Sequence, residues 1–317
     1  MQKIVITGAL GHIGSQLMRS LPAYFPGTEI FLIDNLVTQR YCSLFGLPTT
    51  ARYSFAEMDV TSDNLEPVIR GAGAVVHLAA LTDAAGSFDK RELVEKVNYE
   101  ATGRVAETCA ALNVPLIHLS STSVYGTQND TVSEDCSEDD LQPQSPYAET
   151  KLREENLVRD LGAREGLRFV SCRFGTIFGT SPGMRFHTAV NKFCWQAVMG
   201  QPLTVWKTAF HQQRPYLDLS DAVEAIAFIL RENIFDGEIY NVLTLNAAVS
   251  DIVDAIRIRI PSVEVEFVDS RIMNQLSYVV SVEKFNALGF QSSGDLNRGV
   301  SATIDLLNGA NSIGYVR

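Results

Sequence analysis

Short apolar segments alternate with helical patterns through the first half of the chain. The apolar segments are KIVIT (3–7), EIFLI (29–33), AVVHLA (74–79), PLIHLS (115–120) and LRFVSC (167–172). Their apolar residues are nearly continuous, which is typical of parallel strands covered on both faces. Helical patterns lie between them, notably at 91–112 and 146–164. This alternation predicts an α/β domain with a doubly wound parallel sheet.

The pattern becomes less regular after about residue 175. A loop-rich segment precedes a helix that opens at LSDAVEAIAFIL, for which we expect Ser220 to be the N-cap. A strand at EIYNV and a helix near 296–308 are expected to follow. We therefore expect two units, which are a first domain (1–175, with 216–245 returning to it) and a smaller, interleaved C-terminal substrate lobe (176–215 and 246–317).

The composition is ordinary for a globular protein, with 46% hydrophobic and 20% charged residues. A net charge of −11 argues against general nucleic-acid binding, which needs a cationic surface. No apolar run approaches the ~20 residues of a membrane span, and the first residues indicate a strand and turn rather than a secretion signal. The cysteines are odd in number and lack CxxC spacing, which favours a reducing cytoplasm over disulfides. The histidines lack metal-ligand spacing, so we expect no metal site.

The segment ITGALGHIGSQL places Gly8, Gly11 and Gly14 between the first strand and the first helix. Such glycines permit a tight turn, close approach of a pyrophosphate and close helix–strand packing, and the helix N-terminus offers amide donors to phosphate. A plain strand–helix turn would also explain the triplet, but IFLID follows and ends in Asp34. A carboxylate there accepts the ribose hydroxyls of NAD and repels the additional phosphate of NADP. The sequence therefore predicts a Rossmann-like NAD site, with NADP left open by the nearby Arg40.

Two later segments carry candidate chemistry. SPYAETK supplies Tyr147 and Lys151 on one face of a predicted helix. An adjacent ammonium favours the phenolate of a tyrosine, whose unperturbed pKa is about 10, so Tyr147 could exchange a proton with an alcohol while a hydride moves. LSSTSVYG (119–126) places a run of hydroxyls after a strand, where α/β folds bind ligands. A Ser/Thr turn explains such a run in isolation; beside a nicotinamide, we expect at least one hydroxyl to act in the site.

Together these segments resemble the extended short-chain dehydrogenase/reductases, and within them the NAD-dependent nucleotide-sugar epimerases and dehydratases. The matching landmarks are TGALGHIG, IDNL, DV, HLAA, VN (97–98), SSTSVYG, SPYAETK, RPYLDLSD and YNV, in family order across residues 4 to 242. The resemblance implies that Ser121, Tyr147 and Lys151 are catalytic. The residues expected to contact NAD are Gly8, Gly11, His12, Ile13, Gly14, Asp34, Asn35, Asp59, Val60, Leu78, Ala79, Ala80, Asn98, Tyr147 and Lys151. Those expected to contact a nucleotide-diphosphate sugar are Thr82, Ser121, Thr122, Ser123, Tyr147, Thr176, Arg185, Asn191, Arg214 and Arg271.

Two departures from the family pattern bear on the reaction. Family dehydratases have an Asp-Glu pair directly after the catalytic hydroxyl, where this chain has Thr122 and Ser123. Related decarboxylases usually have a glutamate at the position of Ser123. Hydroxyls are poor substitutes for an acid–base pair, so both chemistries are disfavoured. Many relatives also have asparagine in place of Thr176, so the contacts to the sugar or phosphate are expected to differ.

We therefore predict a nucleotide-sugar epimerase that acts at C4 through a transient keto intermediate with retained NAD. The alternatives are a net NAD(P)-dependent oxidoreductase or a dehydratase acting on a nucleotide sugar or a small carbonyl. A non-catalytic cofactor-sensing protein is a more remote alternative. In relatives the two long helices pack against a second subunit, so the resemblance also implies a homodimer. The sequence identifies neither the sugar nor the nucleotide base.

Overall fold

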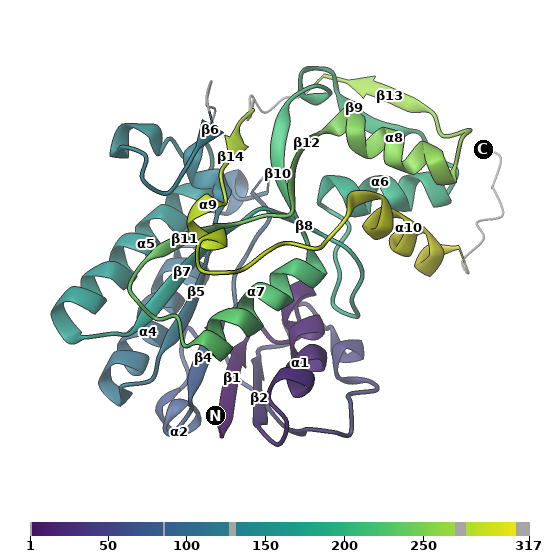
Figure 1. The fold of residues 1–317 in the computed structure, drawn as a ribbon. Helices are drawn as coiled ribbons and strands as arrows, with labels where there is room; N and C mark the ends of the chain where they lie inside the picture. Colours follow the sequence, from purple (N-terminus) through teal and green to yellow (C-terminus); the bar gives the residue numbers. More distant parts are fainter. Residues whose placement is uncertain (1, 85, 127–130, 270–276, 309–317) are drawn as a thin grey trace.

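The predicted parallel sheet forms the centre of the molecule. A computed structural model describes residues 2–84, 86–126, 131–269 and 277–308 (Figure 1). The sheet has seven parallel strands in the order β11-β7-β5-β4-β1-β2-β3. The strands are β1 (Lys3–Thr7), β2 (Glu29–Asp34), β3 (Arg52–Glu57), β4 (Ala74–His77), β5 (Leu116–Ser121), β7 (Phe169–Phe174) and β11 (Ile239–Val242). The strand order reverses between β1 and β4, which is where such sheets bind ligands at their carboxyl edge.

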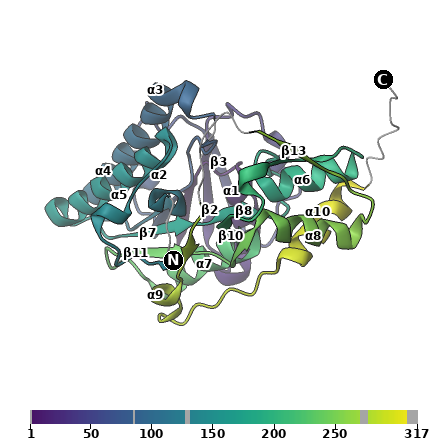
Figure 2. The same ribbon diagram turned by 90° about the horizontal axis from the view of Figure 1, so that it is seen from above.

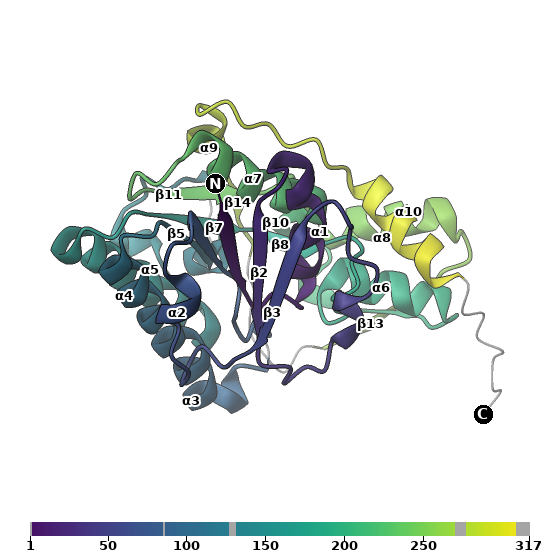
Figure 3. The same cartoon turned by 90° about the horizontal axis from the view of Figure 1, so that it is seen from below.

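Helices cover both faces of this sheet, as Figures 2 and 3 show from above and below. They are α1 (His12–Tyr24), α2 (Glu66–Ile69), α3 (Arg91–Val94), α4 (Ala101–Leu112), α5 (Pro146–Glu165) and α7 (Leu219–Glu232). Ile4 and Ile6 of β1 pack in a cluster with residues of α1 and α7, whereas Val5 packs with residues of α4 and α5. Because successive side chains of a strand point to opposite faces, two-sided burial requires the nearly continuous apolar runs of the sequence. The predicted doubly wound α/β fold is confirmed.

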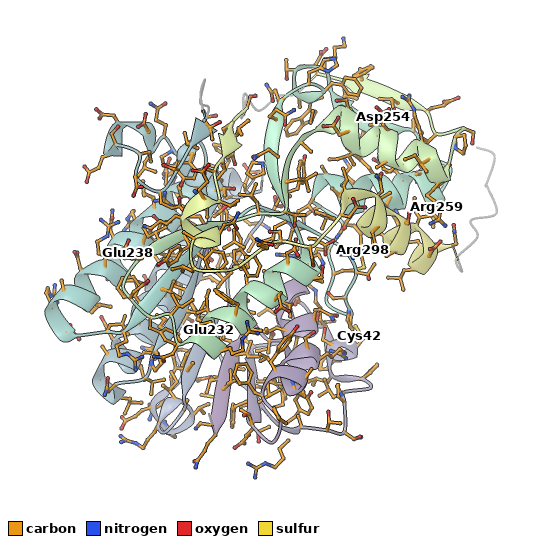
Figure 4. All side chains as sticks on the ribbon, viewed as in Figure 1. Cys42, Glu232, Glu238, Asp254, Arg259 and Arg298 are labelled. Atoms are coloured by element: carbon orange, nitrogen blue, oxygen red, sulfur yellow. The ribbon has the colours of Figure 1, made fainter. Side chains whose placement is uncertain are left out.

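A smaller lobe lies beside the carboxyl edge of the sheet (Figure 1). Its strands are β8 (Thr176–Phe178), β10 (Gln213–Asp218) and β12 (Leu245–Ala248) in one sheet, and β9 (Leu203–Trp206) and β13 (Val265–Val268) in another. Its helices are α6 (Ala189–Val198), α8 (Val249–Arg259) and α10 (Leu296–Leu307), while β6 (Thr131–Val132) pairs with β14 (Val279–Val280) and α9 spans Glu283–Asn286. These lobe helices share their own apolar cluster, and Arg259 of α8, labelled in Figure 4, forms an ion pair with Asp305 of α10.

Two local features differ from, or refine, the expected helices. The N-cap of α7 is Asp218, so the prediction of Ser220 was wrong. The Asp218 carboxylate accepts hydrogen bonds from the Ser220 backbone N–H at 2.8 Å and from its hydroxyl at 2.7 Å, and it reaches the first turn from outside the helix. The segment 91–112 is helical, but a π-helical turn (Glu95–Glu100) lies between α3 and α4. Such turns are frequent at functional sites, and this one contains Asn98.

The described ranges contain no helix with the length and apolarity that crossing a bilayer requires.

Candidate active site

The glycine-rich turn lies at the reversal point of the sheet, between β1 and α1. Gly8 has a φ of +62°, and a Cβ atom on it would lie 2.6 Å from the Ala79 nitrogen. The turn and the segment after β4 are therefore in direct backbone contact. Gly14 allows an equally close approach of α1 to Ala9. Gly11 is the N-cap of α1 and makes no side-chain capping bond, so the first-turn N–H groups of the helix suit the pyrophosphate of a dinucleotide.

Asp34 ends β2 beside this turn. One carboxylate oxygen accepts a hydrogen bond from the Leu10 N–H and the other from the Leu36 N–H, both at 3.0 Å. These bonds hold a partly exposed carboxylate next to the glycine turn, as recognition of the adenosine ribose requires. Arg40 lies over the turn itself, where its guanidinium is 4.0 Å from the position of a Gly11 Cβ. Its charge is therefore directed at the expected position of the pyrophosphate.

The segment after β3 encloses the same end of the site. Asn35 donates a hydrogen bond to the Asp59 carboxylate at 3.1 Å, and the other oxygen of Asp59 accepts from the N–H and hydroxyl of Thr61 at 2.8 and 2.7 Å. Although partial burial opposes ionisation of Asp59, these hydrogen bonds lower its pKa. Val60 is buried next to it. Asp59 therefore keeps a charged acceptor near the predicted adenine.

The segment after β4 completes the predicted cofactor wall. The Leu78 and Ala79 N–H groups donate to the Thr7 hydroxyl at 3.2 and 3.3 Å. Asn98 is fully buried, and its amide accepts from the Leu81 N–H at 2.8 Å and donates to the Leu81 carbonyl at 2.9 Å. The π-helical turn thus clamps the end of the Leu78–Ala80 segment through one side chain. Asn98 itself has no exposed surface, so it supports this wall from behind.

The start of α5 positions the two candidate proton-transfer residues. Ser145 caps the helix by accepting from the Ala148 N–H at 3.2 Å, and Pro146 occupies the first turn. Tyr147 is therefore partly exposed at the helix start, and Lys151 lies one turn further on and is buried. The Lys151 ammonium donates to the Leu119 carbonyl at 2.8 Å and to the Glu154 carboxylate at 2.9 Å.

The hydroxyl run after β5 divides into supporting side chains and one that meets Tyr147. The hydroxyl of Ser120 bonds Glu155, that of Thr122 bonds the Phe174 carbonyl at 3.4 Å, and that of Tyr125 bonds Asn241 at 2.8 Å. The Ser121 hydroxyl instead forms a hydrogen bond with Tyr147 and accepts one from the Ser123 hydroxyl at 2.9 Å. The structure therefore brings together Ser121, Tyr147 and Lys151, which the sequence predicted to act together.

Tyr147 is partly exposed as a residue, but the packing around its phenol controls the protonation of that group. Burial raises the pKa of Tyr147, and the Glu154 carboxylate raises it further, while Lys151, the hydrogen bond from Ser121 and Arg185 act in the opposite direction. Burial also opposes the charged form of Lys151, but Glu154 outweighs it and the pKa of the ammonium is raised. Lys151 therefore keeps its charge, and among the groups that face Tyr147 it is the largest that favours the phenolate.

The predicted substrate residues lie in different environments. Arg185 donates to the Thr82 hydroxyl, and no carboxylate in the described ranges forms an ion pair with its guanidinium. Asn191 is fully buried, and its amide bonds the Arg185 carbonyl at 3.0 Å and the Gly179 N–H at 3.3 Å, so it supports the loop that carries Arg185. Thr176 at the start of β8 and Arg214 in β10 are partly exposed. Arg271 lies outside the described residues.

A segment that the sequence did not single out crosses the glycine turn. The Ser181 hydroxyl donates to the His12 carbonyl at 2.9 Å, and the Gly183 N–H donates to the Ser15 hydroxyl at 3.0 Å. A Cβ on Gly183 would lie 2.3 Å from the Leu10 carbonyl oxygen. This crossing segment, residues 179–183, ties the lobe to the turn. Cys42, labelled in Figure 4, also contacts it by donating to the Pro182 carbonyl at 3.5 Å.

The crossing segment also determines what His12 can contribute. The imidazole bonds the Gly179 carbonyl at 2.8 Å and is buried under the segment. Burial lowers the pKa of His12 to about 4, so the ring is neutral at pH 7 and brings no charge to a phosphate. Only its backbone N–H, together with those of Ile13 and Gly14, remains for the predicted cofactor contact. No local sequence pattern signals this crossing, because it depends on how the lobe packs.

Comparisons with known proteins agree with this geometry. The NAD dependent epimerase/dehydratase family matches residues 4–242. The chain is 29% identical over 318 residues to an Arabidopsis thaliana trifunctional UDP-glucose 4,6-dehydratase/UDP-4-keto-6-deoxy-D-glucose 3,5-epimerase/UDP-4-keto-L-rhamnose-reductase; the match covers 96% of this chain and 47% of that protein. The chain therefore spans about half the length of this curated relative.

Two solved structures are similar over nearly their whole length. MoeE5 in complex with UDP-glucuronic acid and NAD is 27% identical, with a TM-score of 0.83 and coverage of 96% of this chain and 98% of that one. The Thermus thermophilus UDP-glucose 4-epimerase complex with NAD is 25% identical, with a TM-score of 0.84 and coverage of 98% and 100%. The glycine turn and Asp34 fit the same cofactor, so the expectation of NAD is confirmed. The resemblance seen in the sequence is confirmed as well, and this chain belongs to the NAD-dependent epimerase/dehydratase family.

Proposed function

We propose that the protein is a nucleotide-sugar epimerase that inverts C4 of its substrate and retains NAD through the cycle. The family comprises both epimerases and dehydratases, so the choice depends on the residues around the reacting carbon. The most direct support for epimerisation comes from the two side chains that follow Ser121. Thr122 and Ser123 carry hydroxyls, and elimination of water would need an acid and a base near C5.

The described contacts also occupy these two hydroxyls. Thr122 is 2% exposed, and its hydroxyl is directed at the Phe174 carbonyl. Ser123 donates its hydroxyl proton to Ser121. Neither hydroxyl is therefore suited to remove a proton from carbon. This arrangement favours a reaction in which only the C4 hydroxyl exchanges a proton with the protein.

Three side chains have distinct roles in the proposed reaction. NAD, held by the glycine turn and Asp34, would supply the hydride acceptor and donor for C4. In its phenolate form, Tyr147 takes the proton of the C4 hydroxyl and later gives it back, and the Lys151 ammonium favours this form by acting to lower the pKa of the phenol. Ser121 accepts a hydrogen bond from Ser123 and bonds the Tyr147 phenol, and we assign it the hydrogen bond to the C4 oxygen once a substrate lies between the two hydroxyls.

Arg185 favours an anionic substrate. Its guanidinium lies close enough to Tyr147 to affect the pKa of that phenol, and within the described ranges it forms no ion pair. A partly buried guanidinium that no carboxylate of the described residues contacts directly suits phosphate or carboxylate oxygens. We infer that Arg185 contacts the diphosphate, or the carboxylate of an acidic sugar. The UDP-glucuronic acid bound by MoeE5 makes a UDP-hexuronic acid a reasonable member of the substrate panel.

Incubation with UDP-glucose, UDP-glucuronic acid and UDP-N-acetylglucosamine in heavy water tests the proposal. We expect inversion at C4 with no deuterium on the sugar carbons and no accumulation of reduced cofactor, measured by NMR and mass spectrometry. Deuterium at C5 with loss of water would establish a dehydratase instead. Stoichiometric release of NADH would establish the net oxidoreductase. Absence of turnover with every sugar, in a protein that binds NAD, would favour the cofactor-sensing alternative.

We also propose that the protein works as a homodimer formed through α3, α4 and α5. These helices lie on the outer side of the sheet, away from the lobe (Figure 2). The surface of α3 exposes Leu93, which is 47% accessible. A two-fold axis would pack this helix face against the same face of the second subunit.

A further inference from the structure

A buried carboxylate lies directly behind the lysine of the active site. Glu154 is fully buried, one turn beyond Lys151 on the same face of α5. One of its oxygens accepts hydrogen bonds from the Lys151 ammonium at 2.9 Å, the Thr102 hydroxyl at 2.9 Å and a ring nitrogen of His118 at 3.1 Å. Three elements, α4, α5 and β5, therefore converge on one oxygen atom. The proposed reaction assigns no role to this carboxylate.

The neighbouring glutamate provides a contrast. Glu155 is also buried, but Arg173 holds it through two hydrogen bonds, at 2.9 and 2.7 Å. The charge of Glu155 is thus balanced by an arginine that is no part of the site. Glu154 forms ion pairs with Lys151 and with His118, whose imidazole counts as a cation only when protonated, so its permanent cationic partner is the proposed active-site lysine. A charge change at Glu154 therefore acts directly on the site, whereas one at Glu155 reaches Lys151 more weakly and mainly disturbs the pair with Arg173.

We propose that Glu154 is a positioning residue that orients the Lys151 ammonium and offsets part of its charge at Tyr147. This proposal rests on the proposed roles of Tyr147 and Lys151. His118 and Thr102 hold the carboxylate in place, and His118 is itself held by the Ser171 hydroxyl at 3.1 Å.

The orientation follows from the number of donors on the ammonium. A lysine has three N–H donors. The Leu119 carbonyl and Glu154 each accept one of them, at 2.8 and 2.9 Å. One donor then remains for the cleft, where Tyr147 and the predicted nicotinamide ribose lie. Without Glu154 the ammonium could turn toward other partners, so its contact with the cleft would be less well defined.

The charge effect has a definite sign. Tyr147 is faced by Lys151 and Glu154 from α5, by Ser121 from β5 and by Arg185 from the lobe. Glu154 is faced in turn by Lys151, His118 and Thr102, and His77 of β4 is close enough to be affected by its charge. Burial opposes ionisation of Glu154, but Lys151 and His118 outweigh it and lower its pKa to about 2, so it is an anion at any working pH. An anion behind the lysine makes the phenolate harder to form.

The variant Glu154→Gln removes this anion and keeps the shape of the side chain. We expect the titration of the Tyr147 phenol to move to lower pH by about one unit. The phenolate absorbance of the NAD-bound protein, measured as the difference from the same protein carrying Tyr147→Phe, reports this directly. The acidic limb of the kcat profile should move in the same direction, because the phenolate is the form that accepts the proton.

The matched control is Glu165→Gln, the same substitution at the far end of the same helix. Glu165 is exposed and pairs with the exposed Arg164, so neither titration nor turnover should change. A titration of Tyr147 that is unmoved, or that moves to higher pH, in folded Glu154→Gln would overturn the proposal. If that variant does not fold, Glu154→Asp keeps the charge but withdraws it from Lys151, and a smaller shift to lower pH is expected; no shift would again overturn it. The absorbance titration requires no turnover, so it remains decisive even if the protein acts on no nucleotide sugar.

Discussion

At the scale of single residues, the proposed chemistry depends on the Tyr147 hydroxyl. Tyr147→Phe removes one oxygen atom from a partly exposed ring, so we expect turnover to fall roughly 100- to 10,000-fold while NAD binding and the fold are retained. Ser121→Ala should act in the same direction but less strongly, because the phenol remains. Steady-state kinetics with the best sugar, together with a thermal melt, measure both effects. Near-normal turnover of Tyr147→Phe would rule out its role as the proton carrier.

Asp34 is the residue that we expect to determine whether the protein binds NAD or NADP. Its carboxylate is held by two backbone N–H groups at 3.0 Å, so it is already in place before a ribose arrives. We expect Asp34→Ala to weaken NAD binding roughly tenfold and to reduce the ratio of the affinity for NAD to the affinity for NADP. Competitive titration of the two cofactors measures this. Tighter binding of NADP than of NAD by the unmodified protein would contradict the assignment.

The residues of the candidate site differ in how well the sequence predicts their surroundings. Gly8, Asp34, Tyr147 and Lys151 belong to short segments whose spacing has a chemical reason, and the structure brings them to one edge of the sheet. The roles of their neighbours depend on tertiary packing. Glu154 could have been noticed, because residues 147, 151, 154 and 158 form one helical stripe and a carboxylate in a buried stripe needs a partner.

At the scale of elements, the start of α7 offers a direct test of the corrected N-cap. Asp218→Ala removes the acceptor for the Ser220 N–H and should lower the free energy of unfolding by about 1 kcal/mol. Ser220→Ala removes only a hydroxyl that bonds the same carboxylate, so its effect should be smaller. Denaturant unfolding of the two variants measures the difference. If Ser220→Ala lowered the free energy of unfolding more than Asp218→Ala does, Ser220 would be the capping residue instead.

The strands of the main sheet were well predicted because two-sided burial leaves a simple signature. β1 spans Lys3–Thr7 as expected, and β5 and β7 lie within two residues of their predicted bounds. The N-cap of α7 and the π-helical turn in 95–100 were not foreseen. A cap depends on which of several polar side chains reaches the free N–H groups, and a π turn depends on packing against the neighbouring chain. Periodicity reports neither of these.

At the scale of the whole molecule, the lobe and the cofactor turn are one connected structure. The crossing segment 179–183 bonds α1 through Ser181 and Gly183, and it continues directly to Arg185, which bonds Thr82 after β4. A substrate bound by Arg185 would therefore contact the loop that continues directly from the crossing segment over the glycine turn. Sequence patterns could suggest a lobe after residue 175, but not this crossing, because its contacts join residues far apart in the chain. The division into two domains remains a proposal.

The proposed dimer can be tested on the surface of α3. Ion pairs of 2.6 Å between Arg91 and Glu149 and of 2.5 Å between Arg153 and Glu95 already fix α5 to its neighbours, so this face is ordered before a partner arrives. Leu93 of α3 is 47% exposed. A two-fold interface would bury Leu93 of both subunits, and two buried arginines without counter-charges are strongly unfavourable. We therefore expect Leu93→Arg to convert a dimer into a monomer, measured by light scattering.

Leu306→Arg is the matched control for the dimer. Leu306 is 59% exposed on α10 in the lobe, on the opposite side of the molecule from α3 (Figure 2). The substitution adds the same charge to a similarly exposed leucine, so it should leave the mass of the assembly unchanged. A monomeric unmodified protein would contradict the dimer itself. A dimer that survives Leu93→Arg would place the interface elsewhere, and one lost in Leu306→Arg would move it to the lobe.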